Sequence, residues 1–97
     1  MGDVSYPFDQ TSKETYDDCR DLLLRKHEDY GPDNIARAPG GPQLGLAVRL
    51  HDKVARLSHL LTSGQAPKNE SLRDTFMDIC NYGAIGVMVV DGNWPGV

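Results

Sequence analysis

Acidic side chains recur one helical turn apart between residues 70 and 82. In a helix, this segment places Glu70, Asp74, Asp78 and Asn81 in one column, because residues three or four positions apart share a face. A column of carboxylates repels itself, so a divalent cation or basic side chains from a neighbouring helix would have to offset the repulsion. Carboxylate oxygens are ligands that suit hard cations such as Mg²⁺ or Mn²⁺. The simpler alternative is an acidic face that contacts only water.

The chain is long enough for one small domain. It has 97 residues, of which 39% are hydrophobic and 25% charged, which is typical of a folded protein. The formal net charge of -4 argues against general binding to duplex DNA or to a membrane surface. Nucleotides stay open as ligands, because a metal ion can bridge acids and phosphates.

The sequence also favours a cytoplasmic location. The N-terminus lacks the basic and apolar regions of a signal peptide, and the longest apolar run, residues 84–90, is too short to cross a bilayer. We expect Cys19 and Cys80 to be buried free thiols on the apolar sides of helices, although the sequence leaves a disulfide open.

Periodicity predicts an all-α fold in a single domain, residues 1–97. We expect an N-terminal arm over residues 1–11 and a first helix capped by Thr11 or Ser12 that ends at Tyr30. A loop over residues 31–42 then leads to a helix over 43–63, a third helix from 70 to about 90, and a tail over 92–97 in which Trp94 packs on the domain. Residues 82–90 would also suit a buried strand, but no second strand exists to pair with them. Three helices make a small core, so we predict an antiparallel three-helix bundle completed by homo-oligomerisation.

The second helix carries a charged stripe formed by Arg49, Asp52, Lys53 and Arg56. One carboxylate among three cations is what a site for a metal and a phosphate needs beside an acidic helix. Alternatively, Arg49 and Arg56 neutralise the acidic column through ion pairs between helices. Both can hold, if the cations pair with the acids until a ligand arrives.

Three motifs resemble a known family. They are Asp29-Tyr30-Gly31, Arg49-x-x-Asp52-Lys53-x-x-Arg56-Leu57, and Glu70-Ser71-x-x-Asp74-Thr75-x-x-Asp78-x-x-Asn81-Tyr82. Over residues 26–95 the chain resembles the nucleotide modification associated domain 1 family of phages and bacteria. That family in turn looks like a relative of the MazG-like all-α nucleoside triphosphate pyrophosphohydrolases. A phage-encoded chain would act in the host cytoplasm.

The resemblance implies a Mg²⁺-dependent (or Mn²⁺-dependent) hydrolase of nucleoside triphosphates in phage nucleotide metabolism, assembled as a helical dimer or tetramer. Acids of two adjacent helices would hold the metal, which grips the triphosphate and activates a water. The implied metal ligands are Asp52, Glu70, Asp74 and Asp78, with Glu70 and Asp74 catalytic; the implied phosphate- and nucleotide-binding residues are Arg49, Lys53, Arg56, Asn81 and Tyr30.

One departure separates the chain from the MazG-like pattern. The earlier metal-binding helix of that group usually carries Glu-x-x-Glu, whereas the matching helix here has Asp52 and no glutamate. The alternative to an enzyme is therefore a non-catalytic accessory module that binds a nucleotide or docks on a partner. A third possibility is a helical oligomer whose acidic column is a seam of ion pairs.

Overall fold

The computed structural model describes residues 7–64 and 69–97, except for the side chains of residues 69 and 70. The chain forms α1 (Phe8–Tyr30), α2 (Asp33–Ala36), α3 (Pro42–Thr62) and α4 (Asn69–Val90). The described residues contain no strand, so the all-α prediction is confirmed. Residues 82–90 are helical, as predicted.

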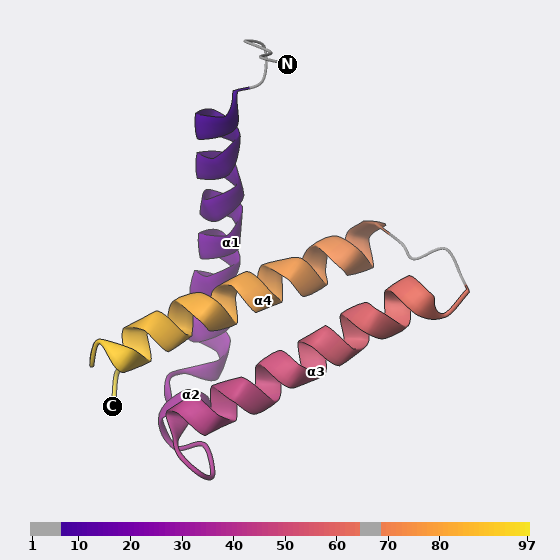
Figure 1. The fold of residues 1–97 in the computed structure, drawn as a ribbon. Coiled ribbons are helices and arrows are strands. Elements are labelled where there is room, and N and C mark those ends of the chain that lie inside the picture. Colours follow the sequence, from indigo (N-terminus) through magenta and orange to yellow (C-terminus); the bar gives the residue numbers. More distant parts are fainter. Residues whose placement is uncertain (1–6, 65–68) are drawn as a thin grey trace.

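The helices are arranged more openly than in an antiparallel three-helix bundle. Helices α3 and α4 run side by side as an antiparallel hairpin, and α1 crosses behind α4 (Figure 1). The N-terminal half of α1 extends away from the hairpin (Figure 1). Residues 9–15 of this half are all polar or charged, so they have no apolar stripe to bury against α3 and α4.

Helix α1 begins at Phe8, before the N-cap predicted at Thr11 or Ser12. The backbone N–H of Thr11 already donates to the carbonyl of Pro7, at 2.9 Å. The Ser12 hydroxyl donates to the carbonyl of Asp9, at 2.8 Å, so it lies inside the helix and does not cap it. Proline is well suited to the position before a helix, because its fixed φ and missing N–H cost nothing there.

The segment predicted as a loop over residues 31–42 contains the short helix α2. Gly31 ends α1 with a φ of 68°, and Gly41 precedes α3 with a φ of 100°. Both backbone conformations favour glycine, because a Cβ would be strained there. Pro42 is the first residue of α3, a position where proline is favoured.

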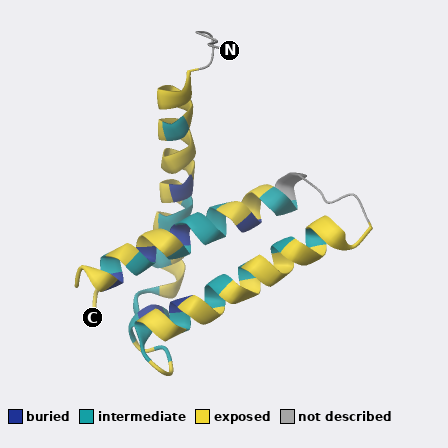
Figure 2. Cartoon of the chain, in the orientation of Figure 1, coloured by how far each residue is buried: buried dark blue, intermediate teal, exposed yellow. Residues whose placement is uncertain are grey.

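The core lies where α2, the start of α3 and the end of α4 meet (Figure 2). Its buried side chains are Ile35, Leu46, Ile85, Val89 and Trp94. Trp94 is 6% exposed, and its indole N–H donates to the carbonyl of Pro32 at 3.0 Å. The tail therefore folds back onto the domain, as predicted for Trp94.

Cys19 on α1 and Cys80 on α4 are both free, as predicted, although only Cys19 is fully buried. Burial raises the pKa of the Cys19 thiol, and a hydrogen bond with Cys80 raises it further. Within the described ranges, no helix combines the length and apolar character needed to span a membrane.

Candidate functional site

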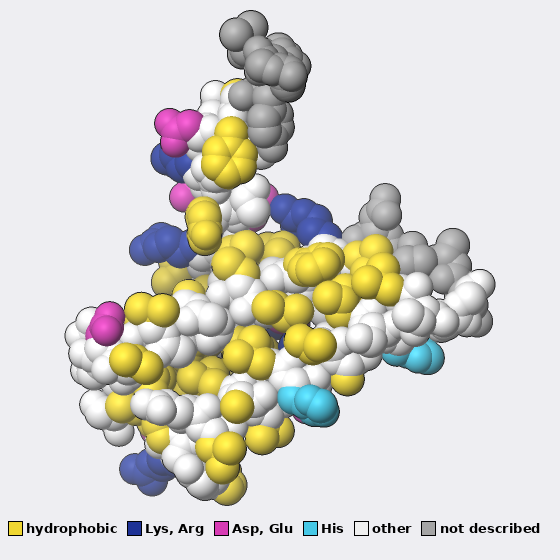
Figure 3. All heavy atoms as spheres, in the orientation of Figure 1, with side chains coloured by type: hydrophobic (Ala, Val, Ile, Leu, Met, Phe, Trp, Pro, Cys, Tyr) yellow, Lys and Arg dark blue, Asp and Glu magenta, His cyan; other side chains and the backbone are white. Residues whose placement is uncertain are grey.

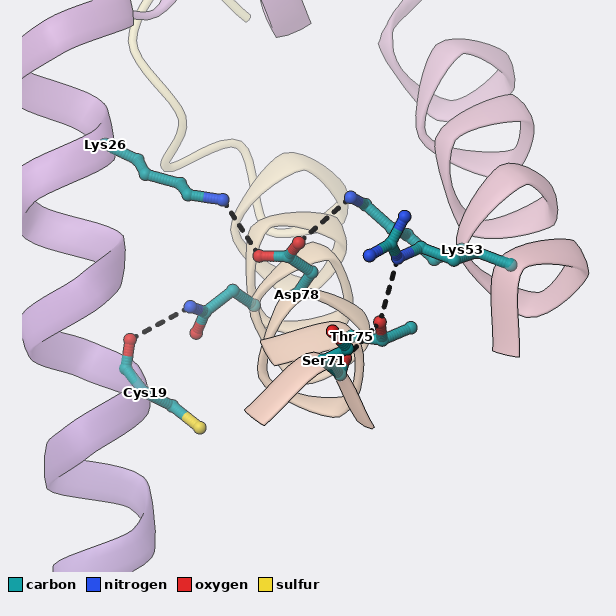
Figure 4. A network of polar contacts seen from close by, with 8 residues as sticks. Cys19, Lys26, Lys53, Ser71, Thr75 and Asp78 are labelled. Carbon is teal, nitrogen blue, oxygen red and sulfur yellow. Dashed lines mark hydrogen bonds and ion pairs between the residues drawn. The ribbon is translucent and has the colours of Figure 1, made fainter. Parts of the chain in front are cut away.

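Asp78 joins three helices. Its Oδ1 lies 2.9 Å from the Nζ of Lys26 on α1, and its Oδ2 lies 3.0 Å from the Nζ of Lys53 on α3 (Figure 4). The Asp78 side chain is 14% exposed. Both oxygens of one nearly buried carboxylate therefore accept hydrogen bonds from ammonium groups, an arrangement that restrains the positions of both lysines.

The pKa values of this cluster follow from its contacts. Burial alone would raise the pKa of Asp78, but the hydrogen bonds from Lys26 and Lys53 outweigh burial and hold the pKa below its ordinary value. The hydrogen bond to Asp78 likewise raises the pKa of Lys26 above its ordinary value, although burial opposes this. Asp78 and Lys26 are therefore both ionised at neutral pH.

A cavity of about 230 Å³ opens beside this cluster. Its polar wall contains the cations Lys26, Arg49 and Lys53. No aspartate or glutamate lines it among the described residues. The other lining side chains are mainly aromatic or apolar: Leu23, His27, Tyr30, Asn34, Ile35, Tyr82, Ile85 and Trp94. A concave site with convergent cations suits an anion, in a chain whose overall charge is negative.

Two polar atoms of residues that line the cavity have no hydrogen-bond partner within the described part of the chain. They are Nδ1 of His27 and Oδ1 of Asn34, and both are buried. The His27 ring also contacts Trp94 edge-on, with ring centroids 5.1 Å apart. The backbone carbonyl of Asn34 accepts a hydrogen bond of 3.3 Å from Arg49, which holds the guanidinium at the cavity. Buried polar atoms usually have partners, and these two, enclosed by protein atoms, are exceptions next to the cavity.

The structure brings together three of the predicted phosphate- and nucleotide-binding residues. Tyr30, Arg49 and Lys53 all line the cavity. Arg56 does not; its Nε donates to the Thr75 hydroxyl at 3.4 Å (Figure 4). Asn81 is buried, and its amide donates to the backbone carbonyl of Cys19 at 2.9 Å. In this structure Arg56 and Asn81 therefore hold helices together.

The predicted metal ligands are not gathered into one site by the described residues. Asp52 and Asp74 are exposed, and the side chain of Glu70 lies outside the described residues. No cluster of three or more histidine, cysteine or acidic side chains suited to a metal exists in ranges 7–64 and 71–97. Both oxygens of Asp78 face ammonium groups, which would repel Mg²⁺ or Mn²⁺. As placed, Asp78 pairs with two lysines, and the Mg²⁺ or Mn²⁺ site stays a prediction from the sequence.

Several cavity residues were not predicted from the sequence as site residues. Lys26 precedes Tyr30 by one helical turn, and Tyr82 follows Asp78 by one turn, so each shares a face with a predicted residue. That spacing is the signal that could have identified them. Trp94 lies in the tail, and its place at the cavity depends on the return of the chain after α4.

No family model, no curated protein and no solved structure matches the chain. The likeness to the nucleotide modification associated domain 1 family and to the MazG-like group therefore stays a prediction from the sequence motifs.

Proposed function

We propose that the chain binds a nucleotide, with the phosphate in the cavity lined by Lys26, Arg49 and Lys53. The observation that carries this proposal is the charge of the wall, which has three cations and no carboxylate among its described residues. Asp78 lies behind two of the cations and neutralises one charge, which leaves an excess that a phosphate dianion can match.

The aromatic part of the cavity supports a nucleotide over a free phosphate. Tyr30 and Tyr82 line the cavity together with the cations, and Tyr30 is 68% exposed to solvent. Pockets that enclose a drug-sized ligand have volumes of about 300–1,000 Å³. The cavity of about 230 Å³ is smaller, so it would hold a phosphate and part of the sugar or base. The rest of the ligand would lie over the exposed ring of Tyr30, where stacking stabilises it.

Hydrolysis of a nucleoside triphosphate stays a prediction from the family resemblance. The arrangement of Asp78 between two lysines favours a phosphate-binding role for this cluster over a metal-binding one. We therefore propose binding that does not require Mg²⁺ or Mn²⁺, which corresponds to the non-catalytic alternative. A nucleotide that displaces the two lysines from Asp78 would remove the arrangement that disfavours a metal. Nucleotide hydrolysis must therefore be measured separately from binding.

Calorimetric titration tests the proposal. Adenosine and uridine mono-, di- and triphosphates would be titrated into the full chain, once with Mg²⁺ and once with a chelator. We expect binding in both conditions. Lys26→Ala should weaken it about tenfold or more, because a charge-assisted hydrogen bond is worth about 1.5–3 kcal/mol. Lys13→Ala is the matched control on the same helix, since Lys13 pairs with Asp17 at an exposed site.

Two results would contradict the proposal. One is the absence of binding by every nucleotide in the presence of chelator, with a chain shown to be helical. The other is equal weakening by the Lys26 and Lys13 variants, which would indicate general charge attraction. Release of pyrophosphate or phosphate in the same samples with Mg²⁺ would show the hydrolase activity that the resemblance implies.

A further inference from the structure

Cys19 and Cys80 meet where α1 crosses α4. Cys19 is the one buried residue of α1, a helix that the structure describes in full. Figure 4 shows its thiol extending from α1 toward α4. The two thiols share a hydrogen bond, and the amide of Asn81, the next residue along α4, donates to the carbonyl of Cys19 at 2.9 Å. Thiols that are this close can form a disulfide after small movements of the side chains and backbone.

Both thiols can be reached through grooves beside the crossing. One groove of about 510 Å³ and another of about 650 Å³ are each lined by Cys19 and Cys80. Figure 3 shows hydrophobic side chains gathered where α1 meets α4. Cys80 is half-buried, whereas Cys19 is only 5% exposed. A small reagent that enters either groove therefore meets Cys80 first.

The protonation of Cys19 supports the same order of reaction. Burial, and then the hydrogen bond with Cys80, hold the pKa of the Cys19 thiol above its ordinary value of 9.0. Cys19 is therefore a protonated thiol at neutral pH and a poor nucleophile toward a reagent in solution. Its closeness to Cys80 compensates for this in a second, intramolecular step.

We propose that Cys19 and Cys80 are a redox-sensitive pair that closes to a disulfide between α1 and α4 in the presence of a small-molecule disulfide. The Cys80 thiolate attacks one sulfur of the reagent, which forms a mixed disulfide and releases one thiol. Cys19 then gives its proton to solvent and attacks the Cys80 sulfur, which displaces the second half of the reagent as a thiolate that takes up a proton. The two cysteines lose two protons and two electrons, and the reagent is reduced to two thiols.

The disulfide would link α1 to α4 covalently. Two ion pairs, Lys26 with Asp78 and Asp18 with Arg73, also join these helices, and the second pair is exposed. A bond between the two thiols closes a long loop, and loop closure of this kind stabilises a fold by constraining the unfolded chain. Helix α1 supplies Lys26 and Tyr30 to the cavity, so the oxidation state of the pair sets how firmly this wall is held.

Oxidation of the folded chain with glutathione disulfide tests the proposal. The products would be treated with N-ethylmaleimide and analysed by intact-mass spectrometry and by a denaturing gel without reductant. We expect the wild type to lose two hydrogens, to migrate as a single chain and to bind no N-ethylmaleimide, because the chain has no other cysteine. Its melting temperature should rise by about 8 °C or more and fall back when dithiothreitol is added. Cys19→Ser and Cys80→Ser should show neither change.

Cys80→Ser combined with Val90→Cys is the matched control. This variant keeps two thiols but moves the second one ten residues along α4, about 15 Å by helical rise, to an exposed position. We expect it to add glutathione without forming an internal disulfide.

A wild type that keeps both thiols would overturn the proposal. So would one that stops at the mixed disulfide with glutathione, or one that forms a disulfide with a second chain. Closure of the control variant to the same extent as the wild type would equally contradict it, because the thiols would then meet through unfolding and not at the crossing. Closure without a rise in melting temperature would contradict the link that holds α1 on α4. None of these measurements involves nucleotide, so their outcome is independent of the proposed function.

Discussion

The ammonium group of Lys26 on α1 lies 2.9 Å from the carboxylate of Asp78 on α4, although 52 residues separate them in the chain. The same carboxylate lies 3.0 Å from the ammonium group of Lys53. This contact links α1 to the α3/α4 hairpin and holds two cations beside the cavity. Asp78 therefore competes for the two lysines with any anion that binds in the cavity.

Asp78→Asn separates the two roles that this carboxylate can have. If Asp78 is a counter-ion of the lysines, its removal leaves one more uncompensated positive charge, and we expect nucleotides to bind about three- to tenfold more tightly without metal, about 0.7–1.4 kcal/mol. If Asp78 is a metal ligand, the variant should instead abolish any Mg²⁺-dependent binding or turnover. Calorimetric titration with Mg²⁺ and with a chelator distinguishes the two results.

The same ion pair should make stability depend on pH in two windows. The pKa of Asp78 lies below its ordinary value of 3.8, so its contribution is present above that value and is lost as the pH falls through the folded-state pKa. The pKa of Lys26 lies above its ordinary value of 10.5, so its contribution is present below that value and is lost as the pH rises through the folded-state pKa.

Urea unfolding of the wild type and of Asp78→Asn across the pH range measures this dependence. We expect the difference in the free energy of unfolding to be constant in the neutral range and to shrink at both extremes. A difference that does not change with pH would contradict the assigned pKa directions.

The helices could be predicted from the sequence, because apolar spacing and terminating glycines and prolines are local signals. The start of α1 at Phe8 and the short α2 were missed, since Pro7 and Pro32 begin helices here without a side-chain cap. The crossing of α1 with α4 is a tertiary relationship. It depends on contacts such as Asn81 to Cys19, which no periodicity along one helix reveals.

The candidate site could be predicted only in part. Arg49 and Lys53 share one helical stripe, so their convergence on the cavity follows from spacing. Lys26 reaches the same cavity from another helix, and the sequence gives no distance between helices. The column of acids could be predicted from the sequence. Whether Asp78 pairs with a cation of the protein or binds a metal depends on which residues the fold places opposite it.

Asn81 provides a test of a residue predicted to contact the nucleotide. Its buried amide donates to the Cys19 carbonyl, so Asn81→Ala leaves that carbonyl without its partner and should lower the free energy of unfolding by about 1–3 kcal/mol. Urea unfolding measures this, with Asn93→Ala as control because Asn93 is exposed in the tail. Unchanged stability together with lost nucleotide binding would support the contact predicted from the sequence.

Trp94 links the tail, the core and the cavity, and its loss should affect both stability and binding. Trp94→Ala removes a side chain that is 6% exposed, together with its hydrogen bond to Pro32, and truncating a buried aromatic side chain costs about 3–5 kcal/mol. Val97→Ala, at an exposed position of the same tail, should stay within about 0.5 kcal/mol of the wild type. Urea unfolding followed by circular dichroism compares the variants, because Trp94 is the only tryptophan and its fluorescence disappears with it. In the wild type that single fluorophore lines the cavity, so nucleotide binding should change its emission. Equal stability of the two variants would show that the tail does not hold the core together.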